Sequence, residues 1–179
     1  MKAKKPLLLA ALVLALLAVA LAAPASAASQ VPLPGTLLGE GEPDYSAPGC
    51  PGAIWTFNGW GTGQMSHLGK VDYEFTQCLY PDLTVRNGMF TLVAANGDKL
   101  FLAYEGQVEV IGANLGFTGA ASWTAVGGTG RFANATGSGT YDVIGDVPGG
   151  DALFDLPDGY MQFTFEGMIA YQASDRSHR

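Results

Sequence analysis

The stretch Gly127-Gly-Thr-Gly-Arg-Phe-Ala-Asn-Ala-Thr-Gly-Ser-Gly-Thr-Tyr141 decides the fold class, together with Phe163-Thr-Phe-Glu-Gly-Met-Ile-Ala-Tyr171 further along the chain. The first contains five glycines in fifteen residues. It cannot form a long helix, because glycine costs roughly 1 kcal/mol relative to alanine in a helix interior. The second alternates and predicts a β-strand with one apolar face. Together they predict a tight corner that leads into the closing strands of an antiparallel barrel.

Short strands are predicted along most of the chain outward from this corner. In 70–78, Val71, Tyr73 and Phe75 alternate with polar residues, and Asn96-Gly97 predicts a hairpin because both central residues of a type I′ turn need positive φ. No segment has a helical period. The eight predicted strands cover 53–57, 70–78, 89–95, 99–105, 107–111, 116–126, 139–144 and 161–171. This series predicts an all-β fold, a single antiparallel eight-stranded barrel, with a β-sandwich as the alternative.

The chain begins with a predicted signal peptide over residues 1–27. Three lysines precede the apolar run Leu7–Leu21, and Ala25-Ser-Ala27 supplies a cleavage pattern. The run is short for a bilayer span, which needs about 20 residues, so an uncleaved anchor is the less favoured alternative. We therefore expect a secreted protein with no membrane span after cleavage. Residues 28–52 hold half of the ten prolines and are predicted to form an extended arm before a barrel domain at 53–172 and a polar tail at 173–179.

The charge balance excludes one class of partner. Without the signal peptide, six basic and sixteen acidic residues remain, and the basic ones are scattered. Nucleic-acid affinity depends on a cationic surface, which this chain lacks, so no nucleic-acid partner is expected. Cys50 and Cys78 are the two cysteines, and in an exported chain such a pair is typical of a disulfide. A reactive thiol is the alternative, but no neighbouring histidine or basic residue would lower its pKa.

Three motifs of the chain carry a family resemblance. The corner at 128–140, the pattern Phe165-x-Gly167-x-Ile169-x-Tyr171 and Ser66-His-Leu-Gly69 together resemble exported bacterial proteins similar to the allene oxide cyclase and dirigent barrels. The resemblance covers about 55–171. It implies an eight-stranded, calycin-like barrel with an apolar lumen, and a homo-oligomer, since the plant members are often trimers. Allene oxide cyclases cyclise a fatty-acid epoxide and dirigent proteins guide phenoxy-radical coupling, but no functional residue of either group aligns here.

Few residues carry recognisable chemistry. Gly128-Thr-Gly130-Arg-Phe-Ala133 has the letters of a dinucleotide fingerprint, but Gly137 and Gly139 follow too soon for the required helix, so turn chemistry is favoured and no cofactor is expected. His67 and Glu74 are the candidates for a catalytic acid or base, although alternation places Glu74 on the outer face. The acidic segment 142–159 fits neither an EF-hand nor a β-roll repeat, so a solvated acidic loop is favoured over a calcium site and we predict no metal site.

Aromatic residues are the candidates for lining the lumen. A small barrel fills its interior with side chains or holds one small ligand. The candidate lumen residues are Trp55, Phe57, Tyr73, Phe75, Trp123, Phe163 and Phe165. Our first hypothesis is a non-enzymatic secreted barrel that binds a small apolar ligand or serves as an extracellular interaction module. The alternative is a cyclase- or isomerase-like enzyme that acts on a hydrophobic substrate in the lumen. A buried carboxyl in an open lumen would favour the enzyme, and an apolar open lumen would favour the binder.

Overall fold

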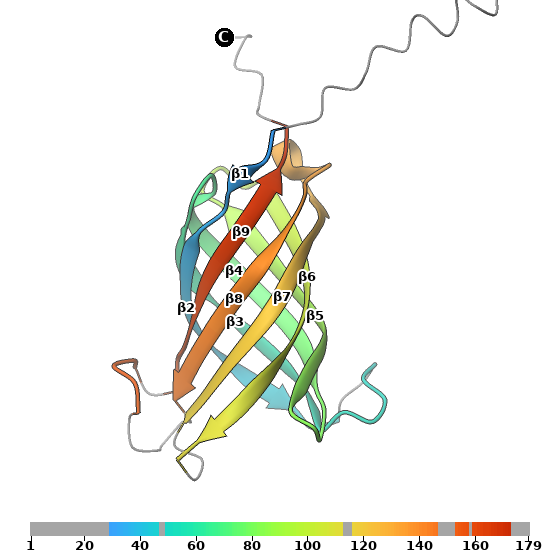
Figure 1. Cartoon of the computed structure of the whole chain (residues 1–179), viewed down its shortest axis with the longest axis vertical. Helices are drawn as coiled ribbons and strands as arrows, with labels where there is room; N and C mark the ends of the chain where they lie inside the picture. Colours follow the sequence, from blue (N-terminus) through green and yellow to red (C-terminus); the bar gives the residue numbers. More distant parts are fainter. Residues whose placement is uncertain (1–28, 47–48, 113–115, 147–152, 158, 173–179) are drawn as a thin grey trace, which may run out of the picture.

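The computed structural model describes residues 29–46, 49–112, 116–146, 153–157 and 159–172, and these form a closed antiparallel barrel of eight strands (Figure 1). A ninth short strand, β1 (Val31–Pro32), pairs with β9. The barrel strands are β2 (Gly35–Asp44), β3 (Trp55–Met65), β4 (Gly69–Leu79), β5 (Thr84–Ala94), β6 (Lys99–Ile111), β7 (Gly116–Gly128), β8 (Thr136–Asp146) and β9 (Met161–Ala170). Each pairs with the next, and β9 closes the cylinder by pairing with both β8 and β2. The predicted barrel is confirmed, and the β-sandwich is not formed. The predicted signal peptide and polar tail lie outside the described residues.

The predicted N-terminal arm is wrong for its central part. Residues 35–44 form β2, which pairs with β3 over its whole length and with β9 over Gly35–Gly39. The outward positions of β2 carry polar or exposed side chains, but its inward positions are mostly glycine. The sequence of β2 therefore shows no alternation of apolar and polar residues, although its backbone forms a regular strand. The barrel domain begins at Gly35 instead of residue 53.

A second difference concerns the strand count. Residues 99–105 and 107–111, predicted as two strands, form the single strand β6, which runs through Gly106. The loss of one strand here and the gain of β2 leave the total at eight. The predicted strand at 53–57 extends to Met65 as β3, because the segment Gly59–Gly63 is as extended as the rest. Glycine interrupted the sequence pattern at both places without interrupting the strand.

Inward-facing glycines are the main packing device of the barrel wall. An ideal Cβ on Gly59 would meet the ring of Phe75, one on Gly88 the ring of Tyr104, and one on Gly139 the ring of Trp123. Each of these glycines lies directly opposite its aromatic residue on the neighbouring strand. The rings therefore occupy the space that a side chain on the opposite strand would need, so that a narrow cylinder can hold many aromatic side chains. Gly97 lies in the predicted Asn96-Gly97 turn and Gly130 in the predicted corner, and both have positive φ, whereas Gly59 and Gly139 lie within regular strand pairings.

The two ends of the barrel differ. β1 and the short 3-10 helix η1 (Gly130–Phe132) lie at one end of the barrel (Figure 1). At this end the side chains of Leu33, Leu68 and Phe132 are buried and close the lumen. The predicted glycine corner at 127–141 contributes Phe132 to this seal, since it contains η1 and the start of β8. The Arg131 guanidinium donates to the carbonyl of His67 at 2.8 Å and lies 3.6 Å from the Asp98 carboxylate. We call this the sealed end.

The opposite end carries the longer connections β2–β3 and β8–β9, and we call it the open end. The predicted disulfide is present there: Cys50, in the β2–β3 connection, is bonded to Cys78 near the end of β4. It closes a loop with a sequence separation of 28 residues, which in the chain-entropy view stabilises the fold by roughly 3–4 kcal/mol. Within the described part of the chain, no helix has the length and apolar character needed to cross a lipid bilayer.

Candidate functional site: a pocket at the open end of the barrel

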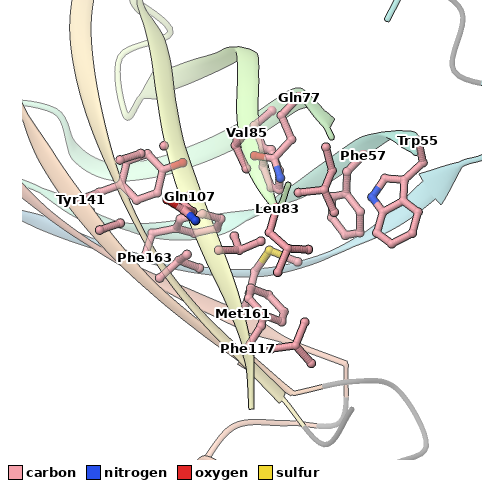
Figure 2. A pocket seen from close by; sticks show the side chains of 18 of the residues that line it. Trp55, Phe57, Gln77, Leu83, Val85, Gln107, Phe117, Tyr141, Met161 and Phe163 are labelled. Atoms are coloured by element: carbon pink, nitrogen blue, oxygen red, sulfur yellow. The ribbon is translucent and has the colours of Figure 1, made fainter. Parts of the chain in front are cut away.

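A cavity of about 360 Å³ occupies the half of the lumen next to the open end (Figure 2). Its walls are formed by the inward-facing positions of strands from around the barrel, and most of its lining is apolar. The side chains of the wall include Trp55, Phe57, Leu79, Val85, Val108 and Met161. We call this cavity the lumen pocket. Its volume is within the range of sites that bury a small organic ligand.

The floor of the lumen pocket is a layer of aromatic rings. Phe75, Tyr141 and Phe163 line the pocket, and each of them contacts Phe90, with ring centroids 5.2–5.7 Å apart. Phe90 is fully buried and lies behind the lining, in contact also with Phe165 on the far side at 5.4 Å. The Phe90 ring therefore separates the lumen pocket from the half of the barrel that side chains fill.

The mouth of the lumen pocket exposes apolar side chains. Ile54, Val110 and Leu153 are 38%, 47% and 40% exposed, and Ile54 and Val110 line the pocket. Tyr45, also exposed, packs edge-on against Trp55 with the ring centroids 5.7 Å apart. These residues come from the β2–β3 connection, the end of β6 and the β8–β9 connection. The entrance is thus both open to water and apolar.

A small polar cluster is set into the apolar wall beside the floor. Gln77, on an inward position of β4, reaches into the lumen pocket between Val85 and Phe57 (Figure 2). Its Oε1 accepts a hydrogen bond of 2.8 Å from the hydroxyl of Tyr104, whose ring packs edge-on against Tyr141. Gln77, Tyr104 and Tyr141 lie on the alternate strands β4, β6 and β8. We call these three residues the polar cluster.

The tyrosines of the interior stay protonated. Burial raises the pKa of Tyr141 above its ordinary value, and burial together with the neighbouring Tyr141 raises the pKa of Tyr104. Burial also raises the pKa of Tyr73, deeper in the barrel. A raised pKa keeps each phenol neutral at physiological pH, so these groups can donate or accept hydrogen bonds but are poor bases.

The predicted lumen residues divide between the two halves of the barrel. Four of them line the lumen pocket: Trp55, Phe57, Phe75 and Phe163. Three are buried nearer the sealed end and belong to the solid core: Tyr73, Trp123 and Phe165. Trp123 also has a structural role there, since its Nε1 donates to the carbonyls of Thr140 and Glu166, both at 3.1 Å. Sequence alternation identified inward residues but could not tell how deep each one lies.

The two candidate catalytic residues lie away from the lumen pocket. His67 is in the turn between β3 and β4 at the sealed end, with φ of 66° and its ring 5.8 Å from that of Tyr171. Glu74 is exposed on the outer face of β4, as alternation predicts, and borders a shallow hollow with Trp60 and Met89. The structure does not bring His67 and Glu74 together, and neither lines the lumen pocket.

The acidic segment contributes a structural carboxylate. Asp146, at the end of β8, is buried, and its Oδ1 accepts from the backbone N–H groups of Leu153 and Phe154 at 2.9 and 3.1 Å. This holds part of the β8–β9 connection at the pocket mouth. Among the residues that the structure describes, no group of three or more His, Cys, Asp or Glu side chains is placed to hold a metal ion. Asp151 and Asp158 lie outside those residues.

Gln77 and Gln107 are polar lining residues that sequence reasoning missed. The strand prediction over 70–78 recorded Val71, Tyr73 and Phe75 as one face, and Gln77 is the next position on it. A polar residue that continues an inward apolar series was therefore the available signal. Tyr104 and Tyr141 carried a similar signal, as polar-tipped residues in strands with apolar neighbours, but their depth depends on barrel closure.

Comparisons with protein-family models, with curated protein sequences and with solved structures gave no match to this chain. The site is therefore interpreted from its own geometry and chemistry.

Proposed function

We propose that this protein is an exported, non-enzymatic binding protein that holds a small apolar molecule in the lumen pocket. The observation that carries the proposal is the cavity of about 360 Å³, walled by aromatic and aliphatic side chains inside a barrel whose other end is solid. A lumen filled by side chains would have favoured an extracellular interaction module instead. Burial of apolar ligand surface against such walls is worth roughly 25 cal/mol per Å².

The chemistry of the lining favours binding over catalysis. Among the described residues that line the lumen pocket, none carries a carboxylate, an imidazole or an amine. General acid-base catalysis needs a group whose pKa lies near the working pH. The phenols at the floor have raised pKa values, which moves them away from that range. This supports a carrier or binding protein over the cyclase- or isomerase-like enzyme.

Export and the barrel family belong to the same proposal. The Cys50–Cys78 disulfide is consistent with an oxidising compartment, as the predicted signal peptide requires. The closed eight-stranded barrel agrees with the shape that the resemblance to allene oxide cyclase and dirigent barrels implies. A shared shape does not transfer an activity, so the proposed function depends on the lumen pocket alone.

The proposal is tested by a thermal-shift screen with neutral ring and chain compounds, among them 2-acetonaphthalene and 1-decanol. A ligand at a hundred times its Kd should add about 2.7 kcal/mol to the free energy of unfolding. The variant Ala121→Phe adds a ring to the pocket wall and should abolish the shift, because Ala121 is buried and lines the pocket. Ser122→Phe adds the same ring on the exposed face of the same strand and should leave it unchanged. No shift with any compound would contradict the proposal.

Trp55 provides an independent signal. It is the one tryptophan among the described lining residues, while Trp60 is on the outer face and Trp123 is in the solid core. Ligand entry should change the fluorescence of the wild-type protein and of Trp60→Phe, but the change should be largely lost in Trp55→Phe. Equal changes in both variants would place the ligand elsewhere on the barrel.

A further inference from the structure

We infer that the lumen pocket selects neutral molecules that carry an oxygen acceptor, which binds the free amide N–H groups of Gln77, and that it rejects carboxylates. This inference rests on the proposed function and specifies the ligand class. It follows from the hydrogen-bond inventory of the polar cluster and from the distribution of charges around the barrel.

The Gln77 amide has hydrogen-bond donors that no described residue uses. A glutamine carboxamide offers one acceptor oxygen and two N–H donors. The Oε1 of Gln77 is taken by the Tyr104 hydroxyl, while its Nε2 makes no hydrogen bond within the described part of the chain. In the structure the Oε1 end of the amide faces the Tyr104 hydroxyl, so the Nε2 is the end that remains for a ligand. A ligand carbonyl, ether or hydroxyl oxygen would satisfy it.

The described lining of the lumen pocket carries no charge that could stabilise a bound ion. An ion transferred from water into an apolar environment pays several kcal/mol unless a counter-charge accompanies it. The polar cluster is neutral, and no cationic side chain is among the described lining residues. The raised pKa values of Tyr104 and Tyr141 report the same penalty, since burial already disfavours a negative charge at that depth.

Within the described residues, the pocket mouth also lacks a free partner for an anion. A long ligand could avoid the cost of burying its anionic head group only if that group stayed in water at the mouth. At the open end, Asp44 is the last residue of β2, and Asp82 and Asp155 lie in the β4–β5 and β8–β9 connections. The described cation at that end is Arg86, and it is paired with Asp82 at 3.3 Å and lies over the ring of Tyr80. The other described basic residues lie at the sealed end: Lys70 and Lys99 at the beginnings of β4 and β6, and Arg131 in η1. An anion would therefore meet an acidic rim.

The lining thus separates ligands by charge and by their ability to accept a hydrogen bond. A neutral ligand with its oxygen at the floor satisfies Gln77 and places its apolar part against the wall. A carboxylate loses its hydration at the floor and gains no partner at the mouth. A hydrocarbon of the same shape fits, but it leaves the Gln77 amide without a partner.

The experiment measures the affinities of naphthalene, 2-acetonaphthalene and 2-naphthoate for the full-length mature protein at pH 7.4, by calorimetry and by Trp55 fluorescence, with 1-decanol and decanoate as a flexible pair. We expect 2-acetonaphthalene to bind about three- to tenfold more tightly than naphthalene, as one neutral hydrogen bond allows. We expect 2-naphthoate to bind at least about a hundredfold more weakly than the ketone. The decyl pair should show the same preference for the neutral compound.

The variant Gln77→Met keeps the length of the side chain and removes the amide. It should abolish the preference for the ketone over naphthalene, and Tyr104→Phe, which removes the hydrogen bond that orients the amide, should reduce it. Val85→Ala serves as the matched control: it alters the wall and should change the affinities for both compounds by the same factor. Circular dichroism checks that each variant is folded.

The outcomes separate the two proposals. If naphthalene and the ketone bind but the carboxylate binds equally well, or Gln77→Met keeps the preference for the ketone, this inference is overturned while the proposed function stands. If no compound of either series binds the folded protein, the proposed function itself fails.

Discussion

Tyr73 and Tyr104 carry the same hydroxyl group into the same barrel interior, but only one of them has a partner. The Tyr104 hydroxyl donates to Gln77, whereas the Tyr73 hydroxyl is buried with no hydrogen-bond partner among the described residues. It points at Gly39, where an ideal Cβ would collide with it. A buried donor without a partner costs about 1–3 kcal/mol, because it has given up its bonds to water.

This difference predicts opposite effects of the same substitution. Tyr73→Phe removes an unsatisfied hydroxyl and should raise the free energy of unfolding by about 1 kcal/mol. Tyr104→Phe removes a made bond and leaves the Gln77 oxygen unpaired, so it should lower that free energy by about 1–2 kcal/mol. Urea denaturation of the three proteins measures both changes. A stability loss in Tyr73→Phe equal to that in Tyr104→Phe would show that the Tyr73 hydroxyl has a partner after all.

The buried tyrosines also predict how the protein responds to alkali. The folded-state pKa values of Tyr73, Tyr104 and Tyr141 are raised, whereas in the unfolded chain tyrosines ionise near pH 10. Above that pH the unfolded state binds fewer protons than the folded state, so stability falls as pH rises. Each such group contributes a slope of up to about 1.4 kcal/mol per pH unit, and the stability is fully present below pH 10.

We therefore expect cooperative unfolding above about pH 10, with the three buried phenols ionising in the same step. Absorbance at 295 nm, which reports tyrosinate, should show this step together with the loss of the circular dichroism signal. Tyr73→Phe should make the fall in stability less steep. Complete ionisation of all seven tyrosines before the barrel unfolds would contradict the raised pKa values.

At the scale of the strands, glycine separates what the sequence predicts from what it does not. Strands with apolar inward positions, such as β4 and β9, can be predicted because apolar and polar residues alternate in their sequences. In β2 the inward positions are mostly glycines, and in the middle of β3 they are all glycines, so the period is present mainly in the backbone. The missing side chains are supplied by rings from the adjacent strand, which is a long-range contact that a local pattern cannot contain.

The same reasoning explains how much of the site was predictable. Trp55, Phe57, Phe75 and Phe163 were identified because each is an aromatic residue at an inward position. The boundary between pocket and solid core was not predictable, because it depends on where Phe90 crosses the lumen and on which rings gather around it. The polar cluster was missed since it joins three strands that are far apart in the sequence.

The glycine–aromatic pairs predict a specific coupling. Gly59→Ala places a Cβ against the ring of Phe75, so we expect a loss of about 1–3 kcal/mol in the free energy of unfolding, as overpacking of a core costs. In a Phe75→Leu background the same change should cost much less, because the smaller side chain can move aside. Urea denaturation of the two single variants and the double variant gives the coupling energy. Additive effects would show that the ring and the glycine do not depend on each other.

For the whole molecule, the arrangement divides the barrel into a solid half and an open half. The sealed end is closed by Leu33, Leu68 and Phe132, which fill its cross-section. The open end keeps the lumen pocket, and the disulfide and the Asp146 hydrogen bonds fix its connections.

Phe90 is the boundary between the two halves, and its replacement should extend the lumen pocket toward the core. Phe90→Leu is expected to lower the free energy of unfolding by roughly 1–3 kcal/mol and to shift the preferred chain length of 1-alkanols upward, because the floor moves deeper. Phe132→Leu is the matched control: it removes a fully buried ring at the sealed end, beyond the boundary, and should destabilise the protein without a change in chain-length preference. Calorimetric titration with octanol, decanol and dodecanol measures that preference. If Phe90→Leu and Phe132→Leu shift it equally, or neither does, the aromatic layer around Phe90 does not set the depth of the pocket.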